Sequence, residues 1–393
     1  MSPLADRAGL LEHVHGLRDE FVSFLSRLVE CESPTDVPGA QAGPQAILTE
    51  ALSGLGFRVG RIRGRNTGGH LLARPARRVP GRPGQLLVGH SDTVWPLGTL
   101  EERPVRQEDG RLYGPGSFDM KGGLTQIVFA LRTLRDLGLD PPLTPVVFMN
   151  SDEEVGSPES ISWVRFLARR VRRAYVLEPS LGAEGRIKTA RKGVSQFIVR
   201  ARGRAAHAGL DPGAGASAIL EMAHVIQSLH GLGDGKGTTV NVGVVEGGIR
   251  PNVVAPACRA EVDVRVLTAE EGRRVEAGIR GLGARTPGVS LEVEAGITIP
   301  PLEWTSRNRR LWDMVREEGS RMGLALREAT AGGGSDGNTI SLFTATLDGL
   351  GPVGDGAHAV HEHVDIGSTL DRCALLARIL MAPDLDDCPE EDR

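Results

Sequence analysis

Three acidic residues stand together in the segment MNSDEEVGSP, residues 149–158, directly after an apolar run. Asp152, Glu153 and Glu154 would repel one another at the end of a buried strand unless a positive charge offsets them. Carboxylates, together with imidazole nitrogens elsewhere in the chain, are ligand types that bind zinc and similar divalent ions. The cluster therefore predicts a metal site.

Two further apolar runs deliver metal-binding side chains where they end. The run QLLVG leads into His90 and Asp92, and the run RAYVL leads into Glu178. Continuous apolar runs are typical of strands covered on both faces of a mostly parallel sheet. Ligands of such sheets bind beyond the carboxyl ends of the strands. We therefore expect these side chains to meet Glu154 at one edge of a sheet.

Asp119 lies in a glycine-rich turn, GPGSFDMKGG, just before the amphipathic segment 124–134. A carboxylate there is favoured by the positive N-terminal end of a helix, so a helix cap explains this residue equally well when it is taken alone. Together with His90, Glu154, Glu178 and a later histidine, it supplies donors for two divalent ions. Such ions would offset the repulsion among the carboxylates.

The segments that carry these residues predict two domains. Apolar residues show helical spacing over much of the first sixty positions, and strand and helix patterns then alternate as far as residue 193. Residues 194–302 follow the order β-α-β-β-α-β, the ferredoxin-like split pattern. We expect a metal-binding domain formed by 1–193 and 303–393, with a smaller domain inserted at 194–302. The fold class is α/β, with a mostly parallel sheet, helices on both faces, and an inserted α+β domain.

The composition narrows the classes of function. The chain has 393 residues, 40% of them hydrophobic, and a net charge of −4, which gives no signal of nucleic-acid binding. No apolar run approaches the ~20 residues needed to span a membrane, and the N-terminus lacks the pattern of a signal peptide, so we expect a cytoplasmic protein. The four cysteines form no CxxC pair and predict neither a zinc ribbon nor a disulfide framework. Eight arginines fall between Arg58 and Arg82; a solvated face, or arginine stems lying along apolar surface with their heads in water, is the simpler interpretation, and a polyanion patch is the alternative.

A family resemblance emerges from the motifs GHSDTV, GPGSFDMKGG, SDEEVGS, LEPS, RAAHAG and GAHAVHEHVD. They occur in the order seen in the dinuclear zinc exopeptidases, which the chain resembles over nearly its whole length. That family includes glutamate carboxypeptidase, succinyl-diaminopimelate desuccinylase, acetylornithine deacetylase and aminoacylases, and the first of these looks nearest. The resemblance implies a zinc-exopeptidase fold, two Zn²⁺ per subunit, with Co²⁺ or Mn²⁺ possible at such ligands, and a homodimer formed through the inserted lid domain.

The resemblance also implies a role for each matching metal-site residue. His90 and Glu178 would bind one zinc ion, Glu154 would bind the other, and Asp119 would bridge the two. Asp92 would orient His90 by a hydrogen bond to its other ring nitrogen, as carboxylates commonly do behind metal-binding histidines.

The remaining ligand is one of three histidines, His358, His361 or His363. The family places its ligand in a G-x-H-x-x-x-E context a few residues before Val-Asp. His358, followed four residues later by Glu362, fits that context, and His361 is the alternative.

Catalysis is assigned by the same resemblance to Glu153 and His207. A water that bridges two metal ions loses its proton near neutral pH. Glu153 would accept that proton as the general base, the hydroxide would attack a peptide or amide carbonyl, and Glu153 would return the proton to the leaving amine. His207, in the motif RAAHAG, would polarise the carbonyl, in the family often from the neighbouring subunit. A turn-capping imidazole is the alternative for this residue.

Substrate recognition is the least defined part of the site. Asn241, Arg250 and Lys192 are candidate contacts, with an exposed loop position as the alternative for the two cations. The glycine loop 332–338, including Gly334, is expected to line the pocket, where backbone donors can approach closely.

Ile299 marks a departure from the glutamate carboxypeptidase pattern. That subfamily carries an Arg before a proline near the end of the inserted domain, where it clamps a substrate carboxylate, whereas this chain has Ile299 before Pro300. We therefore expect a small substrate such as a dipeptide, a C-terminal amino acid or an N-acyl amino acid, and no particular preference for glutamate.

Two other functions fit parts of the sequence. Residues 333–337, GGSDG, match the G-x-S-x-G pattern of a serine hydrolase with Ser335 as nucleophile, and Asp355 and His358 follow in the order of an α/β-hydrolase. The preceding stretch LALREATAGG is too polar for the buried strand that this pattern needs. A non-catalytic binding protein on the same scaffold is the second alternative, but every ligand position and Glu153 are intact.

Overall fold

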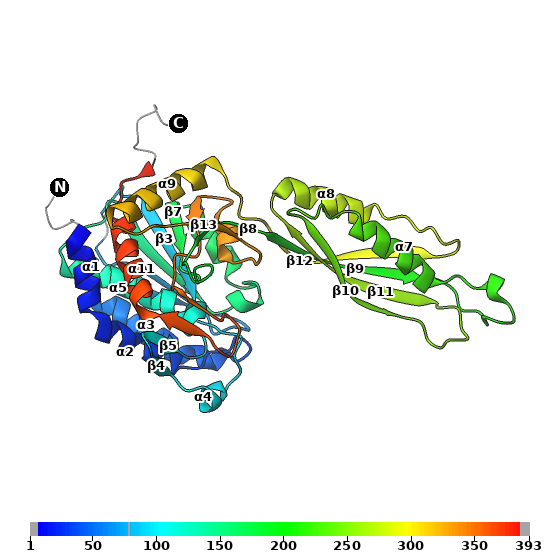
Figure 1. Ribbon diagram of the computed structural model, residues 1–393, viewed down its shortest axis with the longest axis horizontal. Coiled ribbons are helices and arrows are strands. Elements are labelled where there is room, and N and C mark those ends of the chain that lie inside the picture. Colours follow the sequence, from blue (N-terminus) through cyan, green and yellow to red (C-terminus); the bar gives the residue numbers. More distant parts are fainter. Residues whose placement is uncertain (1–6, 78, 386–393) are drawn as a thin grey trace. The chain divides into compact units, whose positions relative to one another are not determined.

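The computed structural model describes residues 7–77 and 79–385, and the chain divides into two compact units (Figure 1). Unit 1 takes in Met1–Thr189, Trp304–Thr330 and Ser335–Arg393, and unit 2 takes in Ala190–Glu303 and Ala331–Gly334. Among the described residues, no helix is both long and apolar enough to cross a membrane. Cys31, Cys258 and Cys373 are free thiols, and Cys388 lies outside the described residues.

Residues 331–334 group with unit 2, although the sequence pattern placed them in the metal-binding domain. The reason is a set of hydrogen bonds to main-chain carbonyls of this short segment. The Arg191 guanidinium donates to the carbonyl oxygens of Gly333 at 2.8 Å and Gly334 at 2.9 Å. The Lys192 N–H donates to the carbonyl of Ala331 at 2.9 Å. These contacts join residues about 140 positions apart, so local sequence patterns do not reveal them.

Unit 1 is built on a six-stranded sheet in the order β1-β2-β6-β3-β7-β14. The β3–β6, β3–β7 and β7–β14 pairs are parallel, and β1 and β2 join the edge as an antiparallel hairpin. The strands are β1 (Phe57–Ile62), β2 (His70–Pro75), β3 (Gly84–His90), β6 (Thr144–Asn150), β7 (Val171–Val176) and β14 (Ala345–Leu347).

Helices cover both faces of this sheet, as the apolar strands require. One face packs against a large hydrophobic core shared by most helices of the unit, and Figure 1 shows α1, α5 and α11 side by side. These helices are α1 (Arg7–Gly16), α2 (Arg18–Val29), α3 (Ala42–Gly54), α5 (Gly122–Asp136), α9 (Ser306–Arg321) and α11 (Ile366–Leu380). The other face is covered by α6 (Ile161–Ala168) and α10 (Asp336–Ile340).

Strand β3 shows why its sequence is a continuous apolar run. Leu87 faces the larger core, while Leu86 and Val88 face the core under α6. Each of these side chains is almost completely buried, and full burial of one such side chain stabilises a fold by roughly 1.5–3 kcal/mol. The strand is therefore fixed in register, and its last residue, His90, is held at the carboxyl edge of the sheet.

Short elements complete unit 1. A second sheet has the order β15-β16-β5-β4, and β8 pairs with β13 in a two-stranded ribbon. They are α4 (Thr99–Glu102), β4 (Arg106–Glu108), β5 (Arg111–Tyr113), β15 (Gly354–Asp355) and β16 (His363–Asp365), together with β8 (Ile187–Arg191) and β13 (Glu328–Ala331), whose last residues are counted with unit 2.

Unit 2 has the β-α-β-β-α-β order that its sequence predicts, with a four-stranded antiparallel sheet in the order β10-β11-β9-β12. Its helices lie along one face of the sheet (Figure 1) and share a core with it. The elements are β9 (Gly193–Arg202), α7 (Ala218–His230), β10 (Thr239–Gly247), β11 (Ala257–Val266), α8 (Ala269–Arg280) and β12 (Ser290–Ile299).

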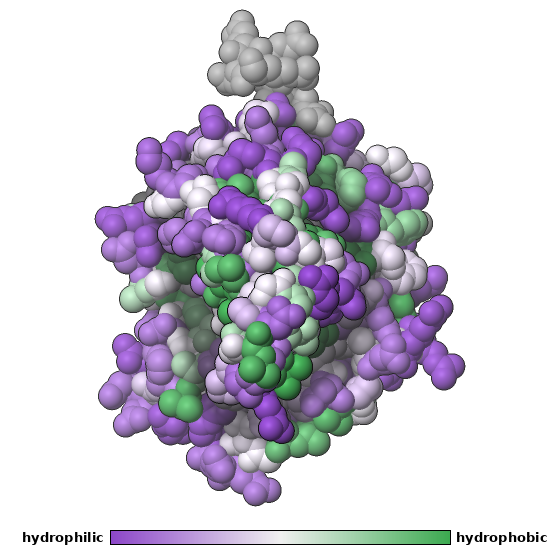
Figure 2. Space-filling view, turned by 90° about the vertical axis from the view of Figure 1, so that its right-hand side faces the viewer, coloured by the Kyte–Doolittle hydropathy of each residue, from purple (hydrophilic) through white to green (hydrophobic). Residues whose placement is uncertain are grey.

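The surface of unit 2 exposes several large hydrophobic side chains. The face of the molecule in Figure 2 is mainly hydrophilic, with separate hydrophobic patches between the polar residues. The exposed large hydrophobic residues of unit 2 are Leu210, Ile219, Leu220, Val244, Val245 and Ile249.

Candidate metal centre

His90 closes β3 and points its ring into a group of carboxylates. Its Nδ1 lies 3.0 Å from the main-chain carbonyl oxygen of Asp92 and 3.4 Å from the Asp92 carboxylate. A proton on Nδ1 satisfies that carbonyl and leaves Nε2 as the free lone pair. Nε2 lies 3.3 Å from Asp119 Oδ1 and 3.3 Å from Glu178 Oε1. The ring is therefore oriented as a metal ligand, with Asp92 on its far side.

Asp119 is brought to His90 by an unusually close approach of α5 to the end of β7. The segment Ser117–Lys121 leads directly into α5, and the Asp119–Met120 peptide bond is cis. A Cβ atom added at Gly123 would lie 2.0 Å from the carbonyl oxygen of Leu177. Only glycine permits this contact, which places Asp119 beside Glu178.

A second group of donors lies on the other side of Asp119. Glu154 belongs to a short 3-10 turn, Glu153–Val155, that follows β6. Its Oε2 lies 3.1 Å from His358 Nε2, and the same nitrogen lies 3.5 Å from Asp119 Oδ2. The structure thus brings His358 to the predicted ligands. His361 instead lies 3.7 Å from the exposed Asp355.

The donor atoms fit a divalent cation. His90 Nε2, Asp119 Oδ1 and Glu154 Oε1 are buried and have no hydrogen-bond partner among the described residues. Two sets of ligand atoms lie within 4.8 Å of one another, one from His90, Asp119 and Glu154, and one from His90, Glu153 and Glu178. Buried polar atoms without partners are costly, and oxygen and nitrogen donors grouped in this way are the ligands of zinc and related ions.

The electrostatics of the site show how strongly it attracts positive charge. Burial alone would lower the pKa of His90, but the nearby carboxylates of Asp119, Asp92 and Glu178 outweigh it and hold that pKa well above its usual value. The hydrogen bond to Glu154 raises the pKa of His358 to about 9. Burial raises the pKa of Glu154, and burial with the charge of Glu178 raises the pKa of Glu153 well above its usual value.

Asp92 links the two halves of the site, a role that goes beyond the one inferred from sequence. Its carboxylate accepts the backbone N–H groups of Glu153 at 3.4 Å and Glu154 at 3.2 Å. It also accepts the hydroxyl of Thr35 at 2.8 Å. One buried carboxylate therefore contacts His90 and fixes the backbone that carries Glu153 and Glu154.

Lys121 is a buried residue of the site that sequence reasoning did not single out. Its side chain is 1% exposed, and its Nζ donates to the carbonyl of Cys31 at 2.7 Å. Burial lowers its pKa to about 8. Its position two residues after Asp119, in the quoted motif FDMKGG, was the available signal.

Glu362 anchors the backbone around Asp119. Its buried carboxylate accepts the N–H groups of Gly116 at 2.9 Å, Phe118 at 3.0 Å and Asp119 at 3.0 Å, and the Trp95 indole N–H at 2.8 Å. In the sequence, Glu362 served only to distinguish His358 from the other two histidines. The structure shows that it holds the turn that carries the central carboxylate.

Replacing Glu362 with Gln should lower kcat/KM and metal affinity by about 10–100-fold, as for other groups that support metal ligands. An amide presents only one oxygen to donors that now bind both carboxylate oxygens. Steady-state kinetics and metal titration measure the effect. Trp95→Phe is the matched control, because it removes one donor of the four and should have the smaller effect. Wild-type values for Glu362→Gln would contradict this positioning role.

The glycine loop contains a buried polar network and no serine–histidine pair. Ser335 caps α10, where its Oγ accepts the N–H of Gly337 and donates to Asp348. No described histidine hydrogen-bonds to Ser335. Asp336 accepts from Asn150 Nδ2 at 2.6 Å and from Ser157 Oγ at 2.6 Å. The loop is thus joined to the end of β6, close to Glu153.

Asp336 gives a pH-dependent contribution to stability. Burial raises its pKa from 3.8 to about 6, so the folded state binds this proton more tightly than the unfolded chain does. The free energy of unfolding therefore falls as pH rises through that interval. Asp336→Asn removes this term, so the variant should gain about 1–3 kcal/mol relative to wild type across the interval. Urea unfolding of both proteins at several pH values measures it, and parallel curves would contradict it.

The predicted residues of unit 2 are described within that unit. His207 is exposed, and its Nδ1 accepts the N–H groups of Gly209 and Leu210, each at 3.2 Å. This is the turn-capping contact considered as the alternative role. Asn241 lies exposed on β10 beside a hollow of about 230 Å³. Arg250 is exposed in the turn before Asn252.

Ile299 lies at the end of β12, against the glycine loop. A Cβ atom added at Gly334 would lie 3.3 Å from Ile299 Cγ2 and 3.8 Å from Val194 Cγ2. The side chains beside Gly334 are therefore aliphatic. The guanidinium of Arg191, which also lies at this loop, already donates hydrogen bonds to the carbonyls of Gly333 and Gly334.

Comparison with known proteins gives one consistent family. The sequence model of Peptidase family M20/M25/M40 matches residues 86–382. Carboxypeptidase G2 from Pseudomonas sp. (strain RS-16) is 27% identical over 92% of this chain and 88% of its own. Acetylornithine deacetylase from Myxococcus xanthus is 31% identical over 76% of this chain and 80% of its own. Among solved structures, aminopeptidase PepT from Bacillus cereus ATCC 10987 has the same fold, with a TM-score of 0.78 and 22% identity over 93% of this chain and 99% of that chain.

Proposed function

Because the chain belongs to Peptidase family M20/M25/M40 and is thus a metal-dependent hydrolase of peptide or amide bonds, we propose that it is a dinuclear zinc enzyme acting on small substrates. The proposed substrates are dipeptides, C-terminal amino acids of short peptides, or N-acyl amino acids. Glu153 is the proposed general base. Co²⁺ or Mn²⁺ can replace zinc at oxygen and nitrogen ligands of this kind.

The position of Asp119 between two donor groups carries this proposal. Its Oδ1 faces His90, beside Glu178, and its Oδ2 faces His358, beside Glu154. A carboxylate that offers one oxygen to each group suits a shared ligand of two cations. When bound, two divalent ions would lower the pKa of a water molecule and polarise the substrate carbonyl.

Glu153 is the group best placed to move the proton of the attacking water. Burial and the charge of Glu178 raise its pKa, and a carboxylate in this position can accept a proton from water and return it to the leaving amine. Its backbone is held by Asp92, and its carboxyl lies within 4.8 Å of His90 and Glu178. Glu154, one residue later, faces His358 and serves as a ligand.

His207 is proposed to donate a hydrogen bond to the substrate carbonyl. Because Nδ1 accepts two backbone N–H groups, the proton of the neutral ring resides on Nε2. The capping contact therefore does not compete with the catalytic role, since it fixes the tautomer that leaves Nε2–H as a donor.

His207→Ala should lower kcat by about 10²–10³-fold, the usual cost of removing one donor to a developing oxyanion, with a smaller change in KM. His230→Ala, which removes an exposed imidazole at the end of α7 of the same unit, is the matched control and should behave as wild type. Steady-state kinetics on the best substrate measure kcat and KM for both variants and the wild type. An unchanged kcat in His207→Ala would leave this imidazole with the turn-capping role alone.

The aliphatic wall formed by Ile299 and Val194 favours substrates without an acidic side chain at that position. Arg250 and Asn241 are proposed to contact the substrate carboxylate or carbonyl.

A panel of dipeptides and N-acyl amino acids, tested on metal-loaded enzyme, identifies the class of substrate. Inhibition by a chelator and insensitivity to a fluorophosphonate are expected, and the reverse pattern would favour a Ser335 hydrolase.

A homodimer through unit 2 is part of the proposal. The large hydrophobic side chains that unit 2 exposes, such as Leu210 and Ile249, suit burial against a second copy, because apolar patches on a surface often mark interaction sites. Light scattering that gives the mass of one chain at micromolar concentration would contradict it.

A further inference from the structure

A cavity of about 460 Å³ lies at the opposite edge of the unit 1 sheet from the metal centre. Gly84, Thr144 and Val171, the first residues of β3, β6 and β7, are part of its lining. The metal-site residues lie at or just after the last residues of the same strands. The cavity is therefore a separate feature that the hydrolytic site does not use.

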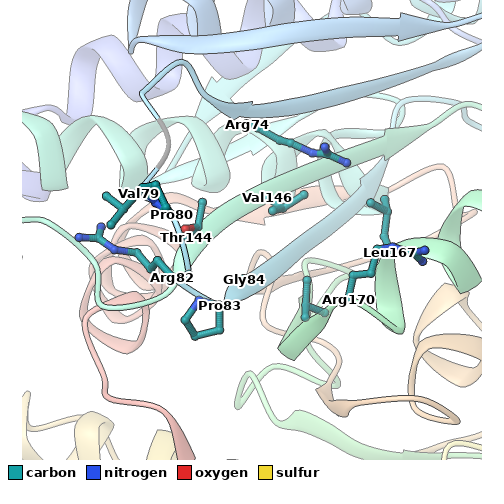
Figure 3. Close-up of a pocket in the computed structure, with 12 residues that line it drawn as sticks. Arg74, Val79, Pro80, Arg82, Pro83, Gly84, Thr144, Val146, Leu167 and Arg170 are labelled. Atoms are coloured by element: carbon teal, nitrogen blue, oxygen red, sulfur yellow. The ribbon is translucent and has the colours of Figure 1, made fainter.

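The walls of this cavity combine an apolar surface with arginines. Figure 3 shows Arg74 extending over Val146 from one side, with Leu167 and Arg170 on the other. Val79, Pro83 and Val171 add further apolar surface. The described residues that line the cavity include Arg74, Arg82 and Arg170, and none of them is an Asp or a Glu.

The three arginines differ in what already binds them. Arg82 forms a two-pronged ion pair with Asp140, at 2.6 and 2.8 Å, and its charge is matched. Arg170 donates to the carbonyl of Phe166 at 2.9 Å and lies 3.6 Å from the centre of the Phe166 ring, and no described carboxylate forms an ion pair with it. The Arg74 side chain is partly buried and forms no ion pair or hydrogen bond with any described residue.

A like-charge neighbour makes the position of Arg74 more costly. Arg58 lies directly opposite Arg74 in the β1–β2 register, and like charges in such a pair are destabilising. Both arginines line an adjoining hollow of about 260 Å³, with Gly60 and Leu72. An arginine stem that lies along apolar surface with its head in water, part of the simpler interpretation of this segment, accounts for the apolar floor under Arg74. It does not account for the second cation, Arg58, placed opposite Arg74 with no described carboxylate paired to the Arg74 side chain.

We propose that this cavity binds a small organic oxyanion, a carboxylate or phosphate carried on an apolar body. The guanidinium forks of Arg74 and Arg170 match an oxyanion in charge and geometry. The aliphatic floor matches the rest of such a molecule, and the volume lies in the range of small-molecule sites.

The test uses benzoate, phenyl phosphate and neutral benzamide as probes, with calorimetric titration of the metal-loaded enzyme. At least one of the two anions binds saturably, and benzamide binds at least about tenfold more weakly, because it cannot form charge-assisted hydrogen bonds. Arg74→Gln and, separately, the exposed Arg170→Gln each weaken the anion about tenfold. Both keep the wild-type kcat, which shows that they are folded.

Arg61→Gln is the matched control. Arg61 is an exposed residue of β1, three positions from Arg58, so its side chain leaves the opposite face of the sheet. This variant binds the anions as wild type does. Equal anion affinity in wild type, Arg74→Gln and Arg170→Gln would place any binding at the metal centre and overturn the proposal. Equal affinity of the wild type for benzamide and for the anions would also overturn it.

Discussion

Replacing Glu153 with Gln should lower kcat by about 10²–10⁴-fold, the range that general base catalysis contributes. Glutamine has nearly the same shape and can hydrogen-bond to water, but it cannot accept the proton. KM and metal content should stay close to those of the wild type, because the proposed ligands are untouched. Steady-state kinetics on the best substrate of the panel, with elemental analysis of the same preparation, provide the measurement.

Metal content is the decisive second readout for Glu153, since its carboxyl lies within reach of His90 and Glu178. If Glu153→Gln loses an ion, the residue is a ligand, and the role of base must pass to another group. If it keeps both ions and turns over at the wild-type rate, Glu153 has no part in proton transfer. Glu101→Gln, an exposed change on α4, is the control for handling and purity.

Replacing Asp119 with Ala should remove the activity altogether, down to the rate without enzyme. This carboxylate is the only one that faces both His90 and His358 among the described ion pairs, so its loss affects both halves of the site. Metal content should fall below that of the wild type. Zinc should raise the thermal midpoint of the wild type but not of the variant, because a ligand stabilises only the state that binds it.

Chelation provides the complementary experiment to Asp119→Ala. A chelator should abolish wild-type turnover, and Zn²⁺, Co²⁺ or Mn²⁺ should restore it, whereas none of them should rescue the variant. Asp313→Ala, an exposed change on α9, should be indistinguishable from wild type in every arm. Full activity of Asp119→Ala, or of thoroughly chelated wild type, would remove the basis for the dinuclear proposal.

The strands that carry the site were predictable because the residue pattern that identifies each strand lies within the strand itself. β3, β6 and β7 are covered on both faces, so their sequences are continuous apolar runs, and His90, Glu154 and Glu178 appear where those runs stop. The elements of unit 2 were equally predictable, since apolar and polar residues alternate along its strands and its helices follow turn-forming residues. In both cases the pattern that determines the element lies within the element.

What could not be predicted depends on contacts between distant residues. Glu362 accepts the N–H of Asp119 across 243 positions, and Asp92 is held by Thr35 across 57. Neither contact leaves a periodic pattern in the sequence, because each joins single residues that lie far apart along the chain. The grouping of residues 331–334 with unit 2 has the same cause, since it rests on Arg191 and on main-chain carbonyls.

The two histidines of the centre have one more consequence. The surrounding carboxylates raise the pKa values of both rings, so protons compete with metal ions for the ring nitrogens. Loading is therefore an exchange reaction that releases acid, and the apparent affinity for zinc weakens as the buffer is acidified. The metal content of the enzyme should therefore fall when it is dialysed against mildly acidic buffer.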